Sequence, residues 1–132
     1  MSPLKPLSGL GLALLFASLA GKPAAAMPDG KALFMSRCAM CHQAAGQGMP
    51  NVYPPLAGSE FVNGPAAKHI QIVLKGLTGS IKVKGKPYNN VMPAQASLMT
   101  DEEIAAVISY ERTSWGNHGG KVTVAQVKAL RK

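Results

Sequence analysis

Apolar residues recur at helical spacing in four separate stretches of this chain, with glycine, proline and polar residues between them. The first stretch, residues 31–37, predicts a short helix that begins near Asp29, a residue type that caps helix N-termini. Phe34 should pack inward from this helix, whereas the basic ends should face water. This helix leads the chain directly to Cys38.

A second helix should begin after Gly64-Pro65, because proline fits the first helical position, where its missing N–H costs nothing. Apolar residues then repeat at helical spacing, and Gly76 or Gly79 should end the helix. His69 lies on this helix, and we expect it to be a partly exposed surface histidine rather than a ligand.

Two further helices carry their own start signals. Thr100 and Glu103 form a capping box, so a helix should run over residues 104–113. Thr123 can cap a last short helix over residues 124–130, with basic residues favourably placed at its C-terminal end. The pattern therefore predicts an all-α fold of about four to five short helices.

Long loops rich in glycine and proline should join these helices. Residues 43–50 should form a loop, and residues 52–58 should be rigid and extended, because a residue before proline is kept out of the helical region. Residues 81–86 should form a small hairpin with Gly85 at its tip.

The amino terminus has the features of a removable export signal. Lys5 supplies a basic start, residues 7–20 are apolar, and Ala24-Ala25-Ala26 satisfies the small-x-small rule for cleavage. The apolar run is shorter than the about 20 residues that a membrane-spanning helix needs. We therefore expect a signal peptide over residues 1–26, one mature domain over residues 27–132 and a periplasmic location; an uncleaved membrane anchor is the alternative.

The expected mature region carries twelve lysine and arginine residues and six acidic residues, a formal charge of +6. A basic balance can indicate nucleic acid or an anionic membrane as the partner. The export signal argues against nucleic acid, and the chain has no basic stripe interleaved with aromatic residues. An acidic protein partner is the better hypothesis, because opposite charge speeds diffusional encounter. The alternative is a basic surface that only maintains solubility.

The candidate chemistry centres on the stretch Cys38-Ala39-Met40-Cys41-His42. This C-x-x-C-H pattern is typical of covalent c-type haem attachment. Residues three apart lie on one face of a helical turn, so both sulfurs can bond the two vinyl groups along one edge of a porphyrin. We predict that Cys38 and Cys41 anchor one haem c by thioether bonds and that His42 is the proximal iron ligand.

Two cysteines could instead belong to a zinc site, a redox dithiol or a disulfide. A structural zinc site normally takes four protein ligands, and the chain offers two cysteines and three histidines. A redox dithiol would sit in a β-α-β context, which the surrounding sequence does not indicate. A disulfide at this spacing closes a tiny loop and stabilises little. Haem attachment is therefore the favoured interpretation.

A methionine thioether at the second axial position would favour reduced iron. Five of the seven methionines lie at the terminus or too close to the attachment motif to reach the far side of the ring. Met92 lies in a loop that Pro93 stiffens, whereas Met99 immediately precedes the capping box, where an apolar residue packs against the new helix. We favour Met92 over Met99 as the distal ligand; the alternative is that Met92 is a core methionine.

With these pieces assembled, the chain resembles class I cytochromes c, the small monohaem type with His/Met ligation. The likeness covers about residues 30–110. It rests on motifs that occur in the family's order: Phe34, the haem-attachment stretch 38–42, Pro54-Pro55-Leu56-Ala57-Gly58, Met92-Pro93 and Tyr110. The resemblance implies a small cytochrome c fold wrapped around one covalent haem, in which the first and last helices cross with Gly30 and Phe34 against Tyr110.

The resemblance also implies roles for residues around the haem. The Pro54 carbonyl would accept a hydrogen bond from the other ring nitrogen of His42, which fixes the imidazole tautomer. Leu56 would pack on the porphyrin. Tyr88 looks similar to residues that approach a haem propionate.

The expected function is one-electron transfer through the exposed haem edge by a periplasmic carrier, which is not an enzyme and takes no small-molecule substrate. Its partners would be redox proteins with acidic docking surfaces, such as a dehydrogenase, a reductase or a terminal oxidase. Lys82, Lys84 and Lys86 are candidates for the docking rim. Two alternatives remain: a five-coordinate haem enzyme or gas-binding protein, and a fixed cytochrome subunit of a dehydrogenase or oxidase complex.

Overall fold

The computed structural model describes residues 1–4, 9, 21 and 25–132. Most of the predicted signal peptide, residues 1–26, lies outside the described residues. In the described part of the chain, the elements follow one another as α1 (Gly30–Arg37), α2 (Ala39–His42), α3 (Glu60–Asn63), α4 (Ala66–Lys75), β1 (Ile81–Val83), β2 (Lys86–Tyr88), α5 (Asp101–Thr113) and α6 (Val124–Leu130).

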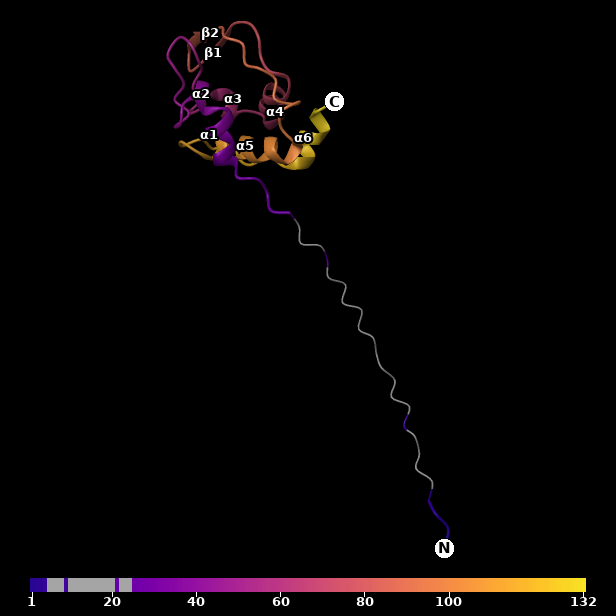
Figure 1. The fold of residues 1–132 in the computed structure, drawn as a ribbon. Helices are drawn as coiled ribbons and strands as arrows, with labels where there is room; N and C mark the ends of the chain where they lie inside the picture. Colours follow the sequence, from indigo (N-terminus) through magenta and orange to yellow (C-terminus); the bar gives the residue numbers. More distant parts are fainter. Residues whose placement is uncertain (5–8, 10–20, 22–24) are drawn as a thin grey trace.

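The predicted crossing of the first and last core helices is confirmed (Figure 1). Helix α1 lies across α5, and Gly30 permits the close approach: a Cβ at Gly30 would overlap the Ala106 carbonyl oxygen and lie 3.0 Å from Cβ of Tyr110. Phe34 is fully buried, and its ring centroid lies 5.7 Å from that of Tyr110. Trp115 completes an aromatic cluster, 4.9 Å from Phe34.

The helix start signals are confirmed by the side-chain bonds that the structure shows. The Asp29 carboxylate accepts from the backbone N–H groups of Lys31 and Ala32, at 2.9 and 3.1 Å. Thr100 forms the expected capping box at the start of α5, and Thr123 forms a second capping box at the start of α6. Each of these bonds satisfies a donor that the helix itself leaves unpaired.

Three features differ from the sequence-based expectation. Pro65 occupies the N-cap position of α4 and not the first helical position. The one-turn helix α3 was not predicted, because a single turn shows no apolar period. The described residues also hold six helices instead of four or five, together with the small β1–β2 hairpin.

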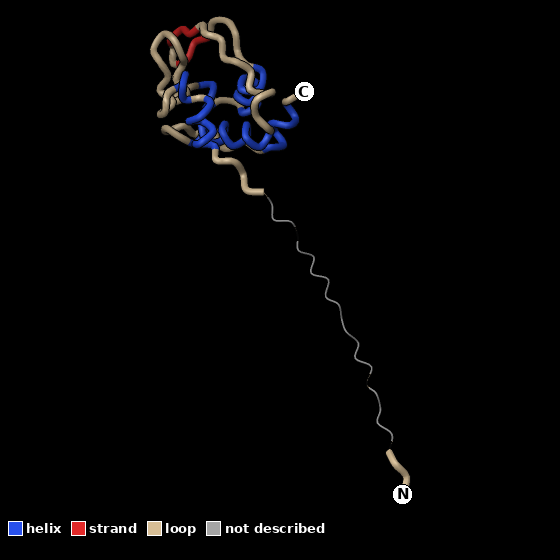
Figure 2. Tube along the Cα trace, in the orientation of Figure 1, coloured by secondary structure: helices blue, strands red, loops and turns tan. Residues whose placement is uncertain are grey.

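The hairpin itself is confirmed as predicted, with an antiparallel register that pairs Ile81 with Tyr88. Lys84 and Gly85 both have positive φ, at 50° and 76°, as a tight two-residue hairpin turn requires. Figure 2 shows most helices gathered on one side of the domain and the hairpin and long loops on the other.

Apolar side chains from α1, α4, α5 and α6 form one core. The C-terminal segment contributes Val122 and Val127, which are 6% and 0% exposed, so this segment is part of the folded domain and not an appendage. Within residues 1–4, 9, 21 and 25–132, no helix is long and apolar enough to cross a membrane.

Candidate functional site

A large, mainly apolar cavity opens between the helices and the loop side of the domain. The empty space inside it is about 1190 Å³ with the open mouth included. All the site residues predicted from the sequence line this cavity: Cys38, Cys41, Pro54, Leu56, Tyr88, His42 and Met92.

The attachment motif forms the predicted helical turn. The backbone N–H groups of Cys41 and His42 both donate to the Cys38 carbonyl, at 3.2 and 2.9 Å. This turn places both sulfurs and the imidazole in the same wall of the cavity. Both cysteines are free thiols and partly buried, so each is available for a thioether bond.

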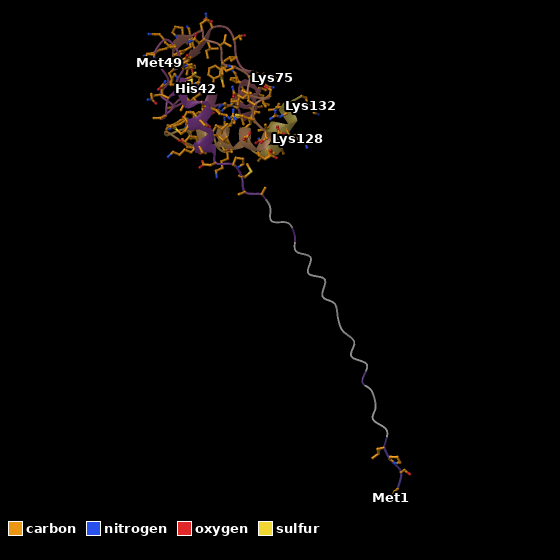
Figure 3. The ribbon with its side chains drawn as sticks, viewed as in Figure 1. Met1, His42, Met49, Lys75, Lys128 and Lys132 are labelled. Atoms are coloured by element: carbon orange, nitrogen blue, oxygen red, sulfur yellow. The ribbon has the colours of Figure 1, made fainter. Side chains whose placement is uncertain are left out.

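The loop that follows His42 orients its ring through a hydrogen bond. Nδ1 of His42 lies 2.9 Å from the Pro54 carbonyl oxygen. A carbonyl oxygen only accepts, so Nδ1 carries the proton and Nε2 keeps its lone pair for a metal. In Figure 3, His42 lies within the domain, whereas Met49 lies toward its edge and is 43% exposed.

Met92 is fixed through its backbone. Met92 and Leu77 exchange two backbone hydrogen bonds, of 2.9 and 3.0 Å, which form an isolated antiparallel bridge. Gly76 allows this contact, because a Cβ there would lie 2.5 Å from the Met92 carbonyl oxygen. Met99 also lines the cavity, and it is 5% exposed within the helical core.

The hairpin supplies another wall of the cavity. Val83 and Tyr88 are buried and line it, and Tyr88 is 6% exposed. The side chains of Lys82, Lys84 and Lys86 are exposed on the same hairpin. The carboxylate of Glu60 accepts from the backbone N–H of Lys84, which ties the turn of the hairpin to α3.

The donor set fits haem c. Two thiols on one turn suit two vinyl groups, and an imidazole nitrogen with a methionine sulfur suits the two axial positions of iron. A directly bound metal ion is not favoured, since the described residues contain no group of three or more His, Cys, Asp or Glu side chains that could hold one.

Comparison with known proteins agrees with this donor set. The family model for cytochrome c matches residues 27–115. The chain belongs to the cytochrome c family. Cytochrome c-552 of Thermus thermophilus is 43% identical over 122 residues, which cover 86% of this chain and 81% of that protein. A second Thermus thermophilus cytochrome c-552 is 44% identical over 112 residues, 78% of this chain and 84% of the relative.

A longer relative is the cytochrome c subunit of alcohol dehydrogenase (quinone) from Gluconacetobacter polyoxogenes. It is 33% identical over 117 residues, 86% of this chain but 24% of the subunit. The family and these relatives confirm the small cytochrome c fold and a covalently attached haem c. This cytochrome is an electron-transfer protein and not an enzyme.

The structure also places a buried histidine–glutamate pair in the cavity of the cytochrome. Nε2 of His69 lies 3.0 Å from Oε2 of Glu111, and both residues are 4% exposed. The expectation of a partly exposed His69 is therefore wrong. Its position four residues before Val73, on the buried face of α4, is a signal that the sequence contains. Glu111 has a comparable signal, since it lies four residues after Val107 and three after Ile108 on the buried face of α5.

Glu111 also affects the attachment turn. Burial, and next the nearby Glu111 carboxylate, raise the pKa of the Cys38 thiol to about 12. An unattached Cys38 would therefore stay protonated at neutral pH. A thioether has no titrating proton, so haem attachment removes this ionisation altogether.

Proposed function

We propose that this cytochrome is a freely diffusing, exported one-electron carrier whose haem iron is bound by His42 and Met92. When bound, haem c supplies an iron that cycles between two oxidation states. The observation that carries the proposal is that both side chains line one cavity and that hydrogen bonds position both residues: the imidazole of His42 through the Pro54 carbonyl, and the backbone of Met92 through Leu77.

In this proposal, Cys38 and Cys41 would hold the porphyrin edge, and His42 through Nε2 and Met92 through its sulfur would be the iron ligands. Two occupied axial positions leave no position for a substrate. The bonds that fix Met92 join backbone groups that do not titrate, and a backbone carbonyl holds the His42 ring, so little needs to rearrange when the charge of the site changes.

Two further residues have proposed contacts with the cofactor. Leu56 is partly buried in the cavity wall and packs against the core, which suits an apolar contact with the porphyrin face. Tyr88 lines the cavity from β2 and has a hydroxyl that suits a propionate oxygen. Tyr88→Phe would test the second contact through a changed reduction potential with an unchanged stability.

Replacing each candidate methionine tests the axial ligand. Met92→Ala should abolish the near-infrared absorption band of the sulfur–iron bond and lower the reduction potential, because the thioether favours reduced iron. Met99→Ala is the matched control: it should keep the band while lowering stability by about 2–5 kcal/mol, as expected for a truncated core methionine. Loss of the band in Met99→Ala alone would contradict the assignment.

The surface beside the cavity supports docking to an acidic redox protein. Lys82, Lys84 and Lys86 are exposed on the hairpin that forms its wall, and Val91, which also lines the cavity, is 66% exposed. An apolar contact surrounded by cations suits a small, transient interface with a negatively charged partner. Electron transfer to such a partner should slow as ionic strength rises; a rate that salt leaves unchanged would contradict the charge steering.

Export is proposed from the sequence, with residues 1–26 as the signal peptide and residues 27–132 as the mature domain. Mass spectrometry of the purified cytochrome tests both boundaries. An amino terminus at Met27 supports cleavage after Ala26. Membrane-bound protein that begins at Met1 would indicate an uncleaved anchor.

A second candidate is a permanent cytochrome subunit of a larger redox complex. The observation in its favour is the similarity to the cytochrome c subunit of alcohol dehydrogenase (quinone), although this chain spans 24% of that subunit. Affinity purification from the native cell distinguishes the two. A free carrier elutes alone, whereas a fixed subunit elutes with a partner in stoichiometric amount.

A further inference from the structure

The His69–Glu111 pair has no part in the axial ligation proposed above. Its two side chains are each 5% exposed, and Nδ1 of His69 has no hydrogen-bond partner although it is buried. Buried polar atoms are nearly always hydrogen-bonded, and a buried ionisable pair is costly to maintain. An ionisable pair with a free buried nitrogen is therefore a candidate functional site.

The pair lies at the thioether edge of the cavity. Glu111 lines the same cavity as Cys38, whose sulfur is expected to bond a vinyl group, and its carboxylate is close enough to help raise the pKa of that thiol. In a haem, the propionates lie on the half of the ring opposite the vinyl groups. His69 and Glu111 would thus lie next to a bound porphyrin and away from its own ionisable groups.

Among the described residues, no other charged side chain forms a hydrogen bond or ion pair with His69 or Glu111. The ionisable side chains that share the cavity wall are Arg37, Cys38, Cys41, His42, Tyr53 and Tyr88. Arg112 follows Glu111 on α5, but its guanidinium donates to backbone carbonyls of residues 62, 64, 119 and 120. On neighbouring elements, Glu60 of α3 bonds the backbone of Lys84, and Lys128 of α6 is exposed.

We infer that the His69–Glu111 pair is a redox-linked proton-binding site, which takes up a proton as the haem iron takes up an electron. This inference rests on the proposed electron-carrier function. With a carboxylate and a neutral imidazole, the pair has a net charge of −1, and one more proton on the imidazole makes it neutral. Electron uptake at the iron removes one positive charge, so the neutral pair is favoured in the reduced protein and the anionic pair in the oxidised protein.

The step balances without a further reactant. One electron from the partner protein reduces ferric to ferrous iron, and one proton from solvent binds a ring nitrogen of His69. No bond between heavy atoms forms or breaks. Re-oxidation by the acceptor protein returns the proton to solvent. The summed charge of iron and pair is then the same in both oxidation states, which a cavity of low dielectric constant favours.

The reduction potential of the haem-loaded cytochrome, measured against pH, tests the inference. Between about pH 5 and about pH 8, where histidine changes charge, the potential should fall as pH rises. The ratio of reduced to oxidised protein at a fixed electrode potential should change at least tenfold, about 59 mV for one electron. A flat profile in the wild-type protein would overturn the inference.

Three variants assign the pH dependence to the pair. Glu111→Gln removes the carboxylate that stabilises a protonated His69, so the sloping region should move to lower pH. The double variant His69→Gln with Glu111→Gln should be flat over the same range. His118→Gln, the control at an exposed histidine, should keep the wild-type profile. A wild-type slope in the double variant would assign the effect to the propionates and overturn the inference.

If the double variant does not fold, nuclear magnetic resonance of the wild-type protein tests whether protonation of His69 depends on the oxidation state of the iron. The ring resonances of His69 should titrate at a higher pH in the reduced than in the oxidised cytochrome, and titration at the same pH in both states would overturn the inference. Failure of the proposed function is separate: carbon monoxide binding to the reduced wild-type protein would remove the six-coordinate carrier but would leave the pH profile measurable.

Discussion

Nδ1 of His42 donates to the carbonyl oxygen of Pro54 at 2.9 Å, across twelve residues of chain. This bond orients the imidazole so that Nε2 keeps its lone pair for the iron. The loop between them folds tightly because Gly48 has no side chain: a Cβ there would lie 2.7 Å from the Pro54 carbonyl carbon. One backbone carbonyl thus positions the proposed proximal ligand.

Weakening the hydrogen bond between His42 and the Pro54 carbonyl should raise the reduction potential of the haem. Pro54→Ala keeps a carbonyl but removes the ring that fixes the backbone, so the hydrogen bond to His42 weakens. A less strongly donating imidazole stabilises ferric iron less, by up to about 1 kcal/mol, the net worth of one hydrogen bond. Voltammetry checks the change against Pro50→Ala, an exposed proline of the same loop. A lower potential in Pro54→Ala would contradict the proposed role.

The close crossing of α1 and α5 should not tolerate a methyl group at residue 30. Gly30→Ala would drive Cβ into the Ala106 carbonyl, and such overpacking typically costs about 1–3 kcal/mol. Urea unfolding of the haem-loaded protein measures the loss. Lys31→Ala, at an exposed position of the same helix, should change stability by less than about 0.5 kcal/mol. Equal effects of the two substitutions would contradict the packing argument.

Asn117 joins the C-terminal segment to the haem-side loop. Its Oδ1 accepts from the Gly58 N–H at 2.8 Å, and its Nδ2 donates to the carbonyls of Leu56 and Glu111 at 3.1 and 2.8 Å. Asn117→Ala leaves these buried groups without partners, which should cost about 1–3 kcal/mol. The free energy of unfolding in urea measures this loss.

Asn90→Ala is the matched control for Asn117→Ala. The Asn90 side chain makes one exposed hydrogen bond, to the Val52 carbonyl at 3.1 Å, so its removal should cost less than about 0.5 kcal/mol. If Asn117→Ala is as mild as Asn90→Ala, the C-terminal segment does not stabilise the loop.

Arg131 stabilises the segment that follows the proposed methionine ligand. Its guanidinium contacts the Asp101 carboxylate and donates to the carbonyls of Ala96 and Met99, the latter at 2.9 Å. The pair with Asp101 is partly exposed and therefore worth little by itself. The two carbonyl bonds from a charged donor should account for most of a loss of about 1–2 kcal/mol in Arg131→Ala.

The same variant should affect ligation. In Arg131→Ala, the near-infrared sulfur–iron band should disappear at a lower urea concentration than in the wild-type protein, because the chain after Met92 is less firmly held. Lys132→Ala, at the exposed neighbouring residue, should behave like wild type. Identical urea midpoints for both variants would contradict this link.

The features that the sequence predicted correctly depend on local spacing or on the family resemblance. The turn at Cys38 follows from residues three and four apart, and the capping boxes at Thr100 and Thr123 each involve two residues three apart. The contact of Gly30 with Tyr110 is long-range, and it was predicted because the motifs resemble class I cytochromes c.

The features that the sequence did not predict depend on side chains far apart in the chain. His69 is buried because Glu111, on another helix, provides a partner at 3.0 Å, and a helical pattern does not identify such a partner. The Arg112 guanidinium donates to the carbonyls of Val62 in α3, Gly64 just after α3 and Gly120 in the C-terminal segment. Its burial lowers its pKa. Only the folded chain shows which partners these buried polar residues have.

The optical spectrum of the reduced cytochrome, recorded before and after addition of carbon monoxide, tests the central claim most directly. The claim is that one haem, tethered through Cys38 and Cys41, has both axial positions filled by His42 and Met92. Protein produced in cells that mature c-type cytochromes should be red, and carbon monoxide should leave its reduced spectrum unchanged. A colourless protein, or a red one whose spectrum shifts readily with carbon monoxide, would contradict the account.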